Sequence, residues 1–175
     1  MRKRLLIFPF LLLFLASLQA QKAKVPSVPV NKESVPQEID RKELLTTAKE
    51  YLGTPYRRGS MDPKKGFDCS GFVCFVFKKF NVTLPRSSGE YKNLRRALKP
   101  EEFQIGDILV FYGYKDKSHI GHLGIICEAN GMKSKFIHSS SGKAYGVTIS
   151  NLDSKGYKRR FYKSIDVIKS PGKSD

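Results

Sequence analysis

Apolar residues follow three patterns along the 175-residue chain, and each pattern predicts a different kind of element. Residues 5–16 are apolar apart from Pro9, with no charged residue among them. Further along, apolar positions recur at helical spacing, as at Leu44, Leu45, Ala48, Tyr51 and Leu52. After Pro100 they fall into short runs separated by Gly-, Asn- and Lys-bearing turns, which is typical of strands.

The first helix is expected to begin at Asp40, because Asp40 and Glu43 have the spacing of a capping box. Gly53 is expected to close this helix as its C′ residue, and Pro55 to prevent its continuation. A polar, glycine-bearing loop is expected over residues 57–66.

The second helix is expected to begin at Cys69, because the residues from there to Phe80 are apolar on nearly every side. A buried strand has the same pattern, but the length of the run favours a helix. Ser87 and Glu90 form a second capping box, which predicts a short helix ending at Leu98.

Strands are expected at residues 108–111, 123–127, 135–138, 146–150 and 160–168. The Asn130-Gly131 pair predicts a hairpin turn between the second and third of them. Helices followed by a run of neighbouring strands predict an α+β fold, with N-terminal helices packed on a C-terminal antiparallel sheet of about five strands.

The first twenty residues have the features of a secretory signal peptide: a basic start, a short apolar run and a small residue, Ala20, at the exit. The apolar run is too short to span a membrane comfortably, although an uncleaved membrane anchor is the alternative. Three prolines in residues 21–38 indicate an extended linker, residues 39–169 are expected to form one domain, and residues 170–175 are expected to fray. The predicted protein is exported to the periplasm or cell envelope, with no stable membrane span, and monomeric.

The formal net charge is +16, and it falls to +13 without the three basic residues of the signal peptide. A basic exported protein is drawn to polyanions, so anionic envelope polymers are candidate partners. A basic surface that serves solubility alone is the alternative. The basic residues are scattered and no nucleic-acid motif accompanies them, so nucleic acid is not expected as a partner.

Cys69 is the candidate nucleophile, since a helix N-terminus stabilises the thiolate that a catalytic cysteine needs. Gly71 follows it and is expected to give a substrate steric access. Cys74 and Cys127 lie in apolar runs and are interpreted as small buried hydrophobes.

The chain has three histidines, and a base for Cys69 must be one of them. His122 stands at the start of a predicted strand, and His138 ends the next one, so the two side chains can meet across the hairpin. His138 would then orient His122 as the third member of a triad. His119 lies in a polar loop but stays an alternative base. A zinc site built from Cys69 and the three histidines is the competing interpretation, but the spacing fits no established ligand set, so neither metal nor cofactor is expected.

Six segments resemble, in order, the motifs of the NlpC-type family of bacterial cell-wall endopeptidases, which have a papain-like fold. They are residues 51–57, 67–73, 84–88, 106–111, 122–126 and 136–140. The resemblance implies a cysteine peptidase that hydrolyses the peptidoglycan stem peptide, usually at the bond between D-glutamate and the diamino acid. It also implies an acyl-enzyme on Cys69. The segment between His122 and His138 is long, which would alter the rim of the cleft.

The resemblance assigns further residues to the site. Tyr56 would supply an oxyanion donor beside the Cys69 amide, and Asp68, Ser70 and Arg86 match positions that line the family's substrate cleft. Asp68 would pair with a stem-peptide amine; alternatively, Arg86 bonds the backbone of the helix cap. Two other functions stay open: an amidase or acyl transferase on the same triad, and a non-catalytic basic envelope-binding protein.

Overall fold

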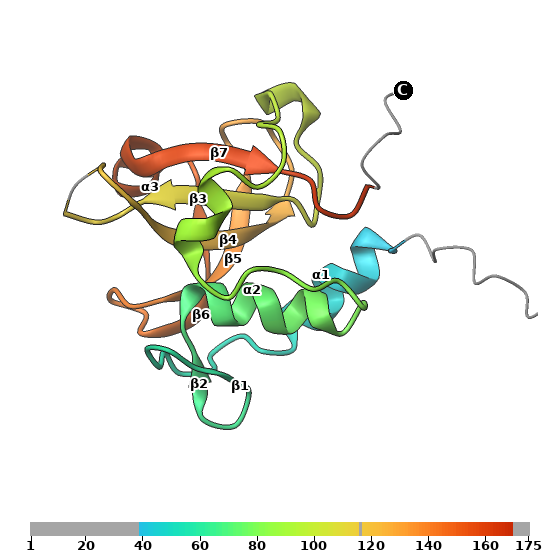
Figure 1. Cartoon of the computed structure of the whole chain (residues 1–175), viewed down its shortest axis with the longest axis vertical. Helices are drawn as coiled ribbons and strands as arrows, with labels where there is room; N and C mark the ends of the chain where they lie inside the picture. The colour runs from blue at the N-terminus through green and yellow to red at the C-terminus, as the bar shows by residue number, and fades with distance from the viewer. Residues whose placement is uncertain (1–38, 116, 170–175) are drawn as a thin grey trace, which may run out of the picture. The chain divides into compact units, whose positions relative to one another are not determined.

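The first helix begins where the capping residue predicts. The computed structural model describes residues 39–115 and 117–169, so the expected signal peptide, linker and C-terminal tail lie outside the described residues. Helix α1 spans Arg41–Lys49 (Figure 1), and the Asp40 carboxylate caps it by accepting a hydrogen bond from the Lys42 amide at 2.8 Å. Leu44, Leu45 and Ala48 form its buried face.

The prediction that Gly53 closes this helix as its C′ residue is wrong. The helix has its C-cap at Glu50, and irregular turns follow. Gly53 does adopt a positive φ, of 83°, but its amide donates to the carbonyl of Val147 at 2.8 Å. The glycine therefore serves a tertiary contact with the sheet rather than the helix end.

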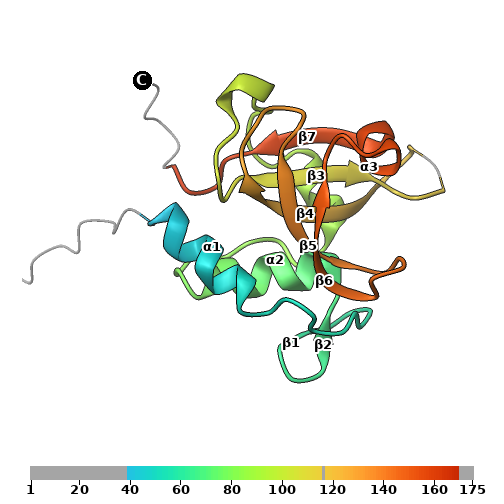
Figure 2. The ribbon, with the colours of Figure 1, turned by 180° about the vertical axis from the view of Figure 1, so that it is seen from behind.

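Helix α2, Cys69–Lys78, confirms the second prediction, since it begins at the cysteine. Nearly all of it is buried, and it packs on the sheet beside α1, as two views of the ribbon show (Figures 1 and 2). The glycine-bearing segment before it is not a plain loop. It contains a short hairpin of β1, Met61–Asp62, and β2, Gly66–Phe67.

The second capping box begins a shorter element than predicted. The Ser87 amide donates to Glu90 at 3.2 Å, but the 3₁₀ helix η1 covers only Ser88–Lys92 and does not reach Leu98. A capping box specifies where a helix starts, and nothing in it specifies length. A second 3₁₀ helix, η2, spans Pro100–Glu102.

Five antiparallel strands form the main sheet, in the order β6-β5-β4-β3-β7. They are β3, Ile108–Tyr112; β4, Ile120–Glu128; β5, Lys135–Ser140; β6, Gly146–Asn151; and β7, Phe161–Ile165. The fold is therefore the predicted α+β class. The last strand is shorter than predicted: it ends at Ile165 instead of residue 168, and Arg160 belongs to a helix, α3, Lys155–Arg160, that the sequence patterns did not indicate.

Successive side chains of each strand point to opposite faces of the sheet, and the core therefore has two clusters. On one face, Leu123, Ile125 and Ile137 pack with Phe72 and Val76 of α2. On the other, a smaller cluster comprises Phe103, Leu109, Phe111, Ile126, Phe136 and Leu152. Because β4 and β5 present alternate residues to the two faces, His122 and His138 share the second face with Ile126 and Phe136. Among the described residues, no helix is long and apolar enough to cross a membrane.

Candidate active site

Cys69 is the first residue of α2, and its sulfur lies against the backbone of strand β4 next to His122. The thiol donates to the carbonyl oxygen of Gly121, at 3.9 Å from the sulfur. The amide of Leu123 is close enough to the same sulfur to lower the pKa of the thiol. The predicted nucleophile thus contacts the backbone immediately before the predicted base, which lies 53 positions further along the chain.

His122 and His138 form a hydrogen-bonded imidazole pair. Nε2 of His122 lies 2.9 Å from Nδ1 of His138, and the two rings meet edge to face. This contact uses one nitrogen of His122 and leaves Nδ1 as the nitrogen available to a thiol or a substrate. His138 is buried in the interior of β5, not at the end of the strand as the sequence predicted.

Two residues that the sequence patterns did not single out complete the chain of contacts behind His138. Ser150 Oγ lies 3.0 Å from Nε2 of His138, and the Tyr157 hydroxyl lies 3.4 Å from the same nitrogen. If His122 donates from Nε2, His138 accepts at Nδ1 and must carry its proton on Nε2, where Ser150 accepts it. Because its hydroxyl can accept this proton, Ser150 is compatible with the tautomer in which His122 Nδ1 is unprotonated.

Gly124 makes room for the imidazole pair. A Cβ atom at this position would overlap the ring of Phe136 and come within 3.2 Å of His138 Cβ. The rings of Phe136 and His138 stack with their centroids 4.6 Å apart. A side chain at residue 124 would therefore displace the group that orients His122.

The surroundings of Cys69 and His122 favour the uncharged form of each side chain at neutral pH. Burial raises the pKa of the Cys69 thiol, and the charge of Asp68 raises it further, while the amides of Leu123, Ser70 and Cys69 lower it. Burial lowers the pKa of His122 well below its usual value, and positive charge on His138 and Arg160 adds to the effect. The pKa of His138 is lowered by the same burial and by Arg160. The resting pair is thus a thiol and a neutral imidazole.

Asp68, Ser70 and Arg86 form one hydrogen-bonded group at the start of α2. The Asp68 carboxylate accepts from the Gly71 amide at 2.6 Å, which caps the helix, and from the Gly59 amide at 2.8 Å. Both of its oxygens also accept from Arg86, at 2.9 and 2.8 Å, and Arg86 donates to Ser70 Oγ at 3.0 Å. Arg86 therefore bonds the carboxylate that caps the helix, and not the cap's backbone.

Gly71 does not serve substrate access, contrary to expectation. The residue is buried, and a Cβ atom there would overlap the carbonyl oxygen of Ser60. The glycine instead allows the preceding loop to pack against the first turn of α2, next to the Asp68 carboxylate.

Burial raises the pKa of Tyr56, and Cys69 lies close enough for a thiolate there to raise it further, so the phenol stays protonated. Its amide donates to the carbonyl of Tyr145 at 3.0 Å, and the two rings lie 5.7 Å apart. Tyr145 has a positive φ of 44°, which is strained for a residue with a side chain. The loop between β5 and β6 is thereby fixed to the segment beside the nucleophile.

The remaining candidates lie apart from these contacts. His119 is exposed at the edge of the loop before β4, where its Nδ1 lies 3.1 Å from Ser118 Oγ. Cys74 is buried, with its thiol 3.1 Å from the Pro85 carbonyl, and Cys127 is half-buried in β4. In the part of the chain that the structure describes, no group of three His, Cys, Asp or Glu residues is arranged to hold a metal.

Known proteins resemble this chain over most of the described residues. The model of the NlpC/P60 family matches residues 53–166. A probable endopeptidase NlpC homolog of Haemophilus influenzae is 35% identical over 73% of this chain and 63% of its own length. The bifunctional muramidase/DL-endopeptidase CwlT of Bacillus subtilis is 35% identical over 72% of this chain and 36% of its own length. The murein DD-endopeptidase MepS/murein LD-carboxypeptidase of Escherichia coli K12 is 28% identical over 78% of this chain and 68% of its own length.

A solved structure shares the arrangement of helices and sheet. An NlpC/P60 family protein from Bacillus cereus matches with a TM-score of 0.66 at 27% identity, over 75% of this chain and 41% of that protein. The chain thus spans less than two thirds of several of these relatives. The family model covers more than half of this chain and includes the nucleophile, the imidazole pair and the capped start of α2. The chain belongs to the NlpC/P60 family.

Proposed function

We propose that this protein is an exported cysteine endopeptidase that hydrolyses peptidoglycan stem peptides through Cys69, His122 and His138. One observation carries the proposal. The Cys69 sulfur lies between the backbone groups that flank His122, and His122 is bonded to His138 at 2.9 Å. A nucleophile, a base and a group that orients the base are the minimum for thiol-based acyl transfer.

In the proposed reaction, the Cys69 thiol gives its proton to Nδ1 of His122 as the sulfur attacks the scissile carbonyl. His122 then carries a proton on each nitrogen, and His138 accepts the hydrogen bond from Nε2. The imidazolium returns a proton to the leaving amine, which departs and leaves a thioester on Cys69. Water, deprotonated by His122, hydrolyses the thioester and frees the thiol.

The oxyanion of the tetrahedral intermediate would be stabilised by the Cys69 amide and the Tyr56 hydroxyl. The amide is at a helix N-terminus, where backbone donors point outward. The raised pKa of Tyr56 supports its role as a donor, because a protonated phenol can donate a hydrogen bond.

Asp68, Ser70 and Arg86 are proposed to line the acyl side of the cleft. They adjoin Cys69 in sequence or through the Asp68 carboxylate. That carboxylate is already bonded to two amides and to Arg86, so a substrate amine would share it rather than neutralise it alone. The group would position the stem peptide by its existing geometry.

The bond between D-glutamate and the diamino acid is the proposed target. Two relatives support it by name: CwlT is a DL-endopeptidase, and another Bacillus subtilis relative, 33% identical over 65% of this chain, is a gamma-DL-glutamyl hydrolase. MepS is named for other bonds. The family therefore contains enzymes for several bonds, and the cleft must select among them.

The proposed place of action is the periplasm or cell envelope. The support is the basic, then apolar, start of the chain, with cleavage near Ala20 and residues 21–38 as a linker. The enzyme is proposed to act as a monomer, and its basic surface would hold it on anionic envelope polymers.

A non-catalytic binding protein is the second candidate from a different class. A structure with the same fold, RipD of Mycobacterium tuberculosis, is described as a non-catalytic NlpC/p60 domain protein adapted to peptidoglycan binding, so the fold alone does not imply hydrolysis. The bonded imidazole pair beside a thiol favours the enzyme, because a binder has no need of an oriented base.

The deciding experiment is digestion of peptidoglycan with the purified chain and with Cys69→Ala, followed by mass spectrometry of the released fragments. Products cut between D-glutamate and the diamino acid, absent with the variant, are expected. Intact stem peptides released from sugar would assign an amidase instead. No products, with both proteins sedimenting with the wall, would favour the binder.

A further inference from the structure

Helix α3 has too few apolar residues to be stable by itself. Apart from Tyr157 it consists of lysine, arginine and glycine, none of its residues is buried, and no side chain caps its first turn. A free helix of this length does not persist in water. Contacts with the rest of the fold must therefore hold α3, and Tyr157 supplies its aromatic ones.

The ring of Tyr157 packs against both imidazoles of the candidate site. It lies nearly parallel to His122, with 25° between the planes and 6.0 Å between the centroids, and it meets His138 edge to face at 5.3 Å. Phe111 and Phe136 of the sheet surround the same group, with their ring centroids 5.5 and 4.9 Å from that of Tyr157. The tyrosine thus completes an aromatic enclosure that the sheet alone leaves open.

The ring of Tyr157, more than its hydroxyl, makes these contacts. The hydroxyl lies 3.4 Å from Nε2 of His138, whereas Ser150 Oγ lies 3.0 Å from the same nitrogen. Ser150 is therefore the better placed hydrogen-bond partner. Phenylalanine at position 157 would keep every ring contact and lose only the longer of the two polar contacts.

Arg160 fixes the ring of Tyr157 and anchors α3 to the sheet. Its Cζ lies 5.1 Å from the centroid of the Tyr157 ring. Its Nε donates to the Gly156 carbonyl at 3.1 Å, and its Nη1 donates to the Tyr112 carbonyl of β3 at 3.3 Å. In both views of the ribbon α3 lies beside β3 (Figures 1 and 2). The helix thus holds Tyr157 in a defined place over the imidazole pair.

The enclosure affects the protonation of His122. The titratable groups around this residue are Cys69 of α2, His138 of β5, and Tyr157 and Arg160 of α3. Burial has the largest effect and lowers the pKa of His122, and positive charge on His138 and Arg160 lowers it further. Removal of the Tyr157 ring would admit water to the imidazoles, weaken the effect of burial and raise the pKa of His122.

We propose that Tyr157 is a positioning residue of the active site: its ring covers one side of the imidazole pair, excludes water from it and holds the two imidazoles in their bonded arrangement. The inference rests on the proposed function, in which His122 is the base. It adds to the site a residue outside the triad, and it gives α3 a function.

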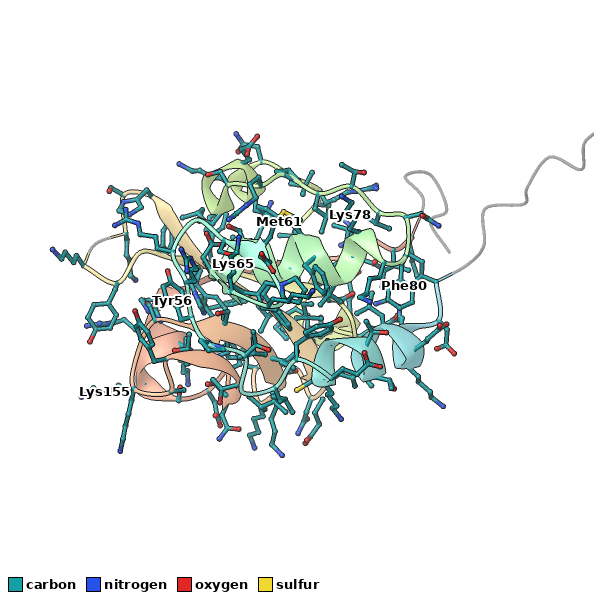
Figure 3. The ribbon with its side chains drawn as sticks, turned by 90° about the horizontal axis from the view of Figure 1, so that it is seen from below. Tyr56, Met61, Lys65, Lys78, Phe80 and Lys155 are labelled. Atoms are coloured by element: carbon teal, nitrogen blue, oxygen red, sulfur yellow. The ribbon has the colours of Figure 1, made fainter. Side chains whose placement is uncertain are left out.

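The first test needs no cleavage. Nitrogen and carbon NMR follows the titration of His122 in the full mature chain carrying Cys69→Ala, with Tyr157 kept or changed to Phe, Leu or Ala. The matched control is Lys155→Ala, because Lys155 belongs to the same helix but is exposed and projects from its start (Figure 3).

Tyr157→Ala should raise the pKa of His122 toward the ordinary histidine value of about 6.5. Tyr157→Leu fills part of the space and should raise it less, and this variant decides the matter where alanine prevents folding. Tyr157→Phe and Lys155→Ala should leave the titration unchanged. The inference is overturned by an unchanged titration in the alanine and leucine variants. It is also overturned if Tyr157→Phe behaves like Tyr157→Ala, because the hydroxyl would then be the group that matters.

The second test measures cleavage of a soluble stem peptide by the Cys69 protein. Tyr157→Ala should lower kcat about tenfold with little change in KM, and it should move the acid limb of kcat/KM to higher pH. Tyr157→Phe should restore both. A loss of kcat with an unmoved acid limb would indicate a structural role only and overturn the inference. A changed His122 titration in a protein that cleaves no substrate would keep the cover over the imidazoles and reject the proposed function.

Discussion

At the scale of single residues, the unusual feature of the site is that the contacts running from His122 through His138 end on the hydroxyls of Ser150 and Tyr157. A carboxylate behind the imidazole pair would hold an imidazolium by charge, whereas Ser150 holds His138 through a hydrogen bond of an uncharged hydroxyl. Orientation and tautomer, more than charge, are what His138 supplies to His122. The contribution of the serine is therefore measurable apart from that of the thiol.

Ser150→Ala is expected to lower kcat about tenfold, with little change in KM, because His138 loses a hydroxyl that can accept its Nε2 proton and so support the His122 tautomer with a free Nδ1. Nitrogen NMR of the imidazoles should show mixed tautomers in the variant. Ser154→Ala is the matched control, since this exposed serine makes no side-chain cap bond to α3. A single unchanged tautomer in Ser150→Ala would refute the role.

Arg160 is expected to set the acid limb of the pH profile. In the proposed mechanism His122 works only when neutral. Burial, then positive charge on His138 and Arg160, lower its pKa, so activity should persist below the ordinary histidine pKa. Arg160→Gln removes one of these charges, raises the pKa of His122 and moves the limb of kcat/KM to higher pH. Arg160→Lys should stay near the wild type. If the acid limb of kcat/KM lies at the same pH in the wild type, Arg160→Gln and Arg160→Lys, Arg160 does not have this role.

At the scale of elements, the close approach of β4 and β5 depends on a position without a side chain. Gly124→Ala should lower the free energy of unfolding by about 1–3 kcal/mol, because its Cβ overlaps Phe136. Gly156→Ala is the matched control. Nothing lies within 4 Å of a Cβ there, and alanine in α3 should be neutral or stabilise by about 0.5–1 kcal/mol. Denaturant unfolding of both variants decides the matter, and equal stability would contradict the steric argument.

The elements that the sequence predicted are those with strong local signals. Helix α2 combines a capping aspartate with an apolar run, and β4 and β5 flank a turn with glycine at positive φ. Helix α3 escaped prediction because none of its residues is buried, so it has no apolar period. Cys69, His122 and His138 stood out by residue type. Ser150 and Tyr157 did not, because their contacts with His138 depend on the register of β6 against β5 and on the placement of α3.

At the scale of the molecule, Arg41 joins distant parts of the chain. Its guanidinium bonds the carboxylates of Asp107 at 2.8 Å and Asp166 at 2.6 Å, and the Ile105 carbonyl at 2.8 Å. Asp107 is almost fully buried, and burial raises its pKa to about 6 against the pull of the Gln104 amide and Arg41. Helix α1, strand β3 and the segment after β7 are thus tied through one side chain.

Arg41→Met should cost about 3 kcal/mol at pH 8, because it leaves a buried carboxylate without its partner. The pKa of Asp107 then rises further above its unfolded value, so the folded variant gains stability as the pH falls and the carboxyl takes up a proton. The deficit should therefore shrink toward pH 5 in unfolding experiments. Arg96→Met, which breaks an exposed pair with Glu102, should change little at either pH. A deficit independent of pH would contradict the account.

The overall positive charge predicts a salt effect that depends on the substrate. Cleavage of intact wall should slow between about 50 mM and about 500 mM salt, because screening weakens attraction to anionic polymers. A soluble stem peptide should be cut at nearly the same rate in both. Equal salt dependence for the two substrates would place the effect in the active site instead.

The placement of the Cys69 sulfur against Gly121 and Leu123 also determines when the site forms during folding. Nothing near Cys69 in the sequence can serve as its base, so a growing or unfolded chain carries an ordinary thiol. Only when β4 has docked on α2 does the Cys69 sulfur reach the backbone next to His122. In the proposed mechanism, folding is therefore the step that assembles the nucleophile with its base.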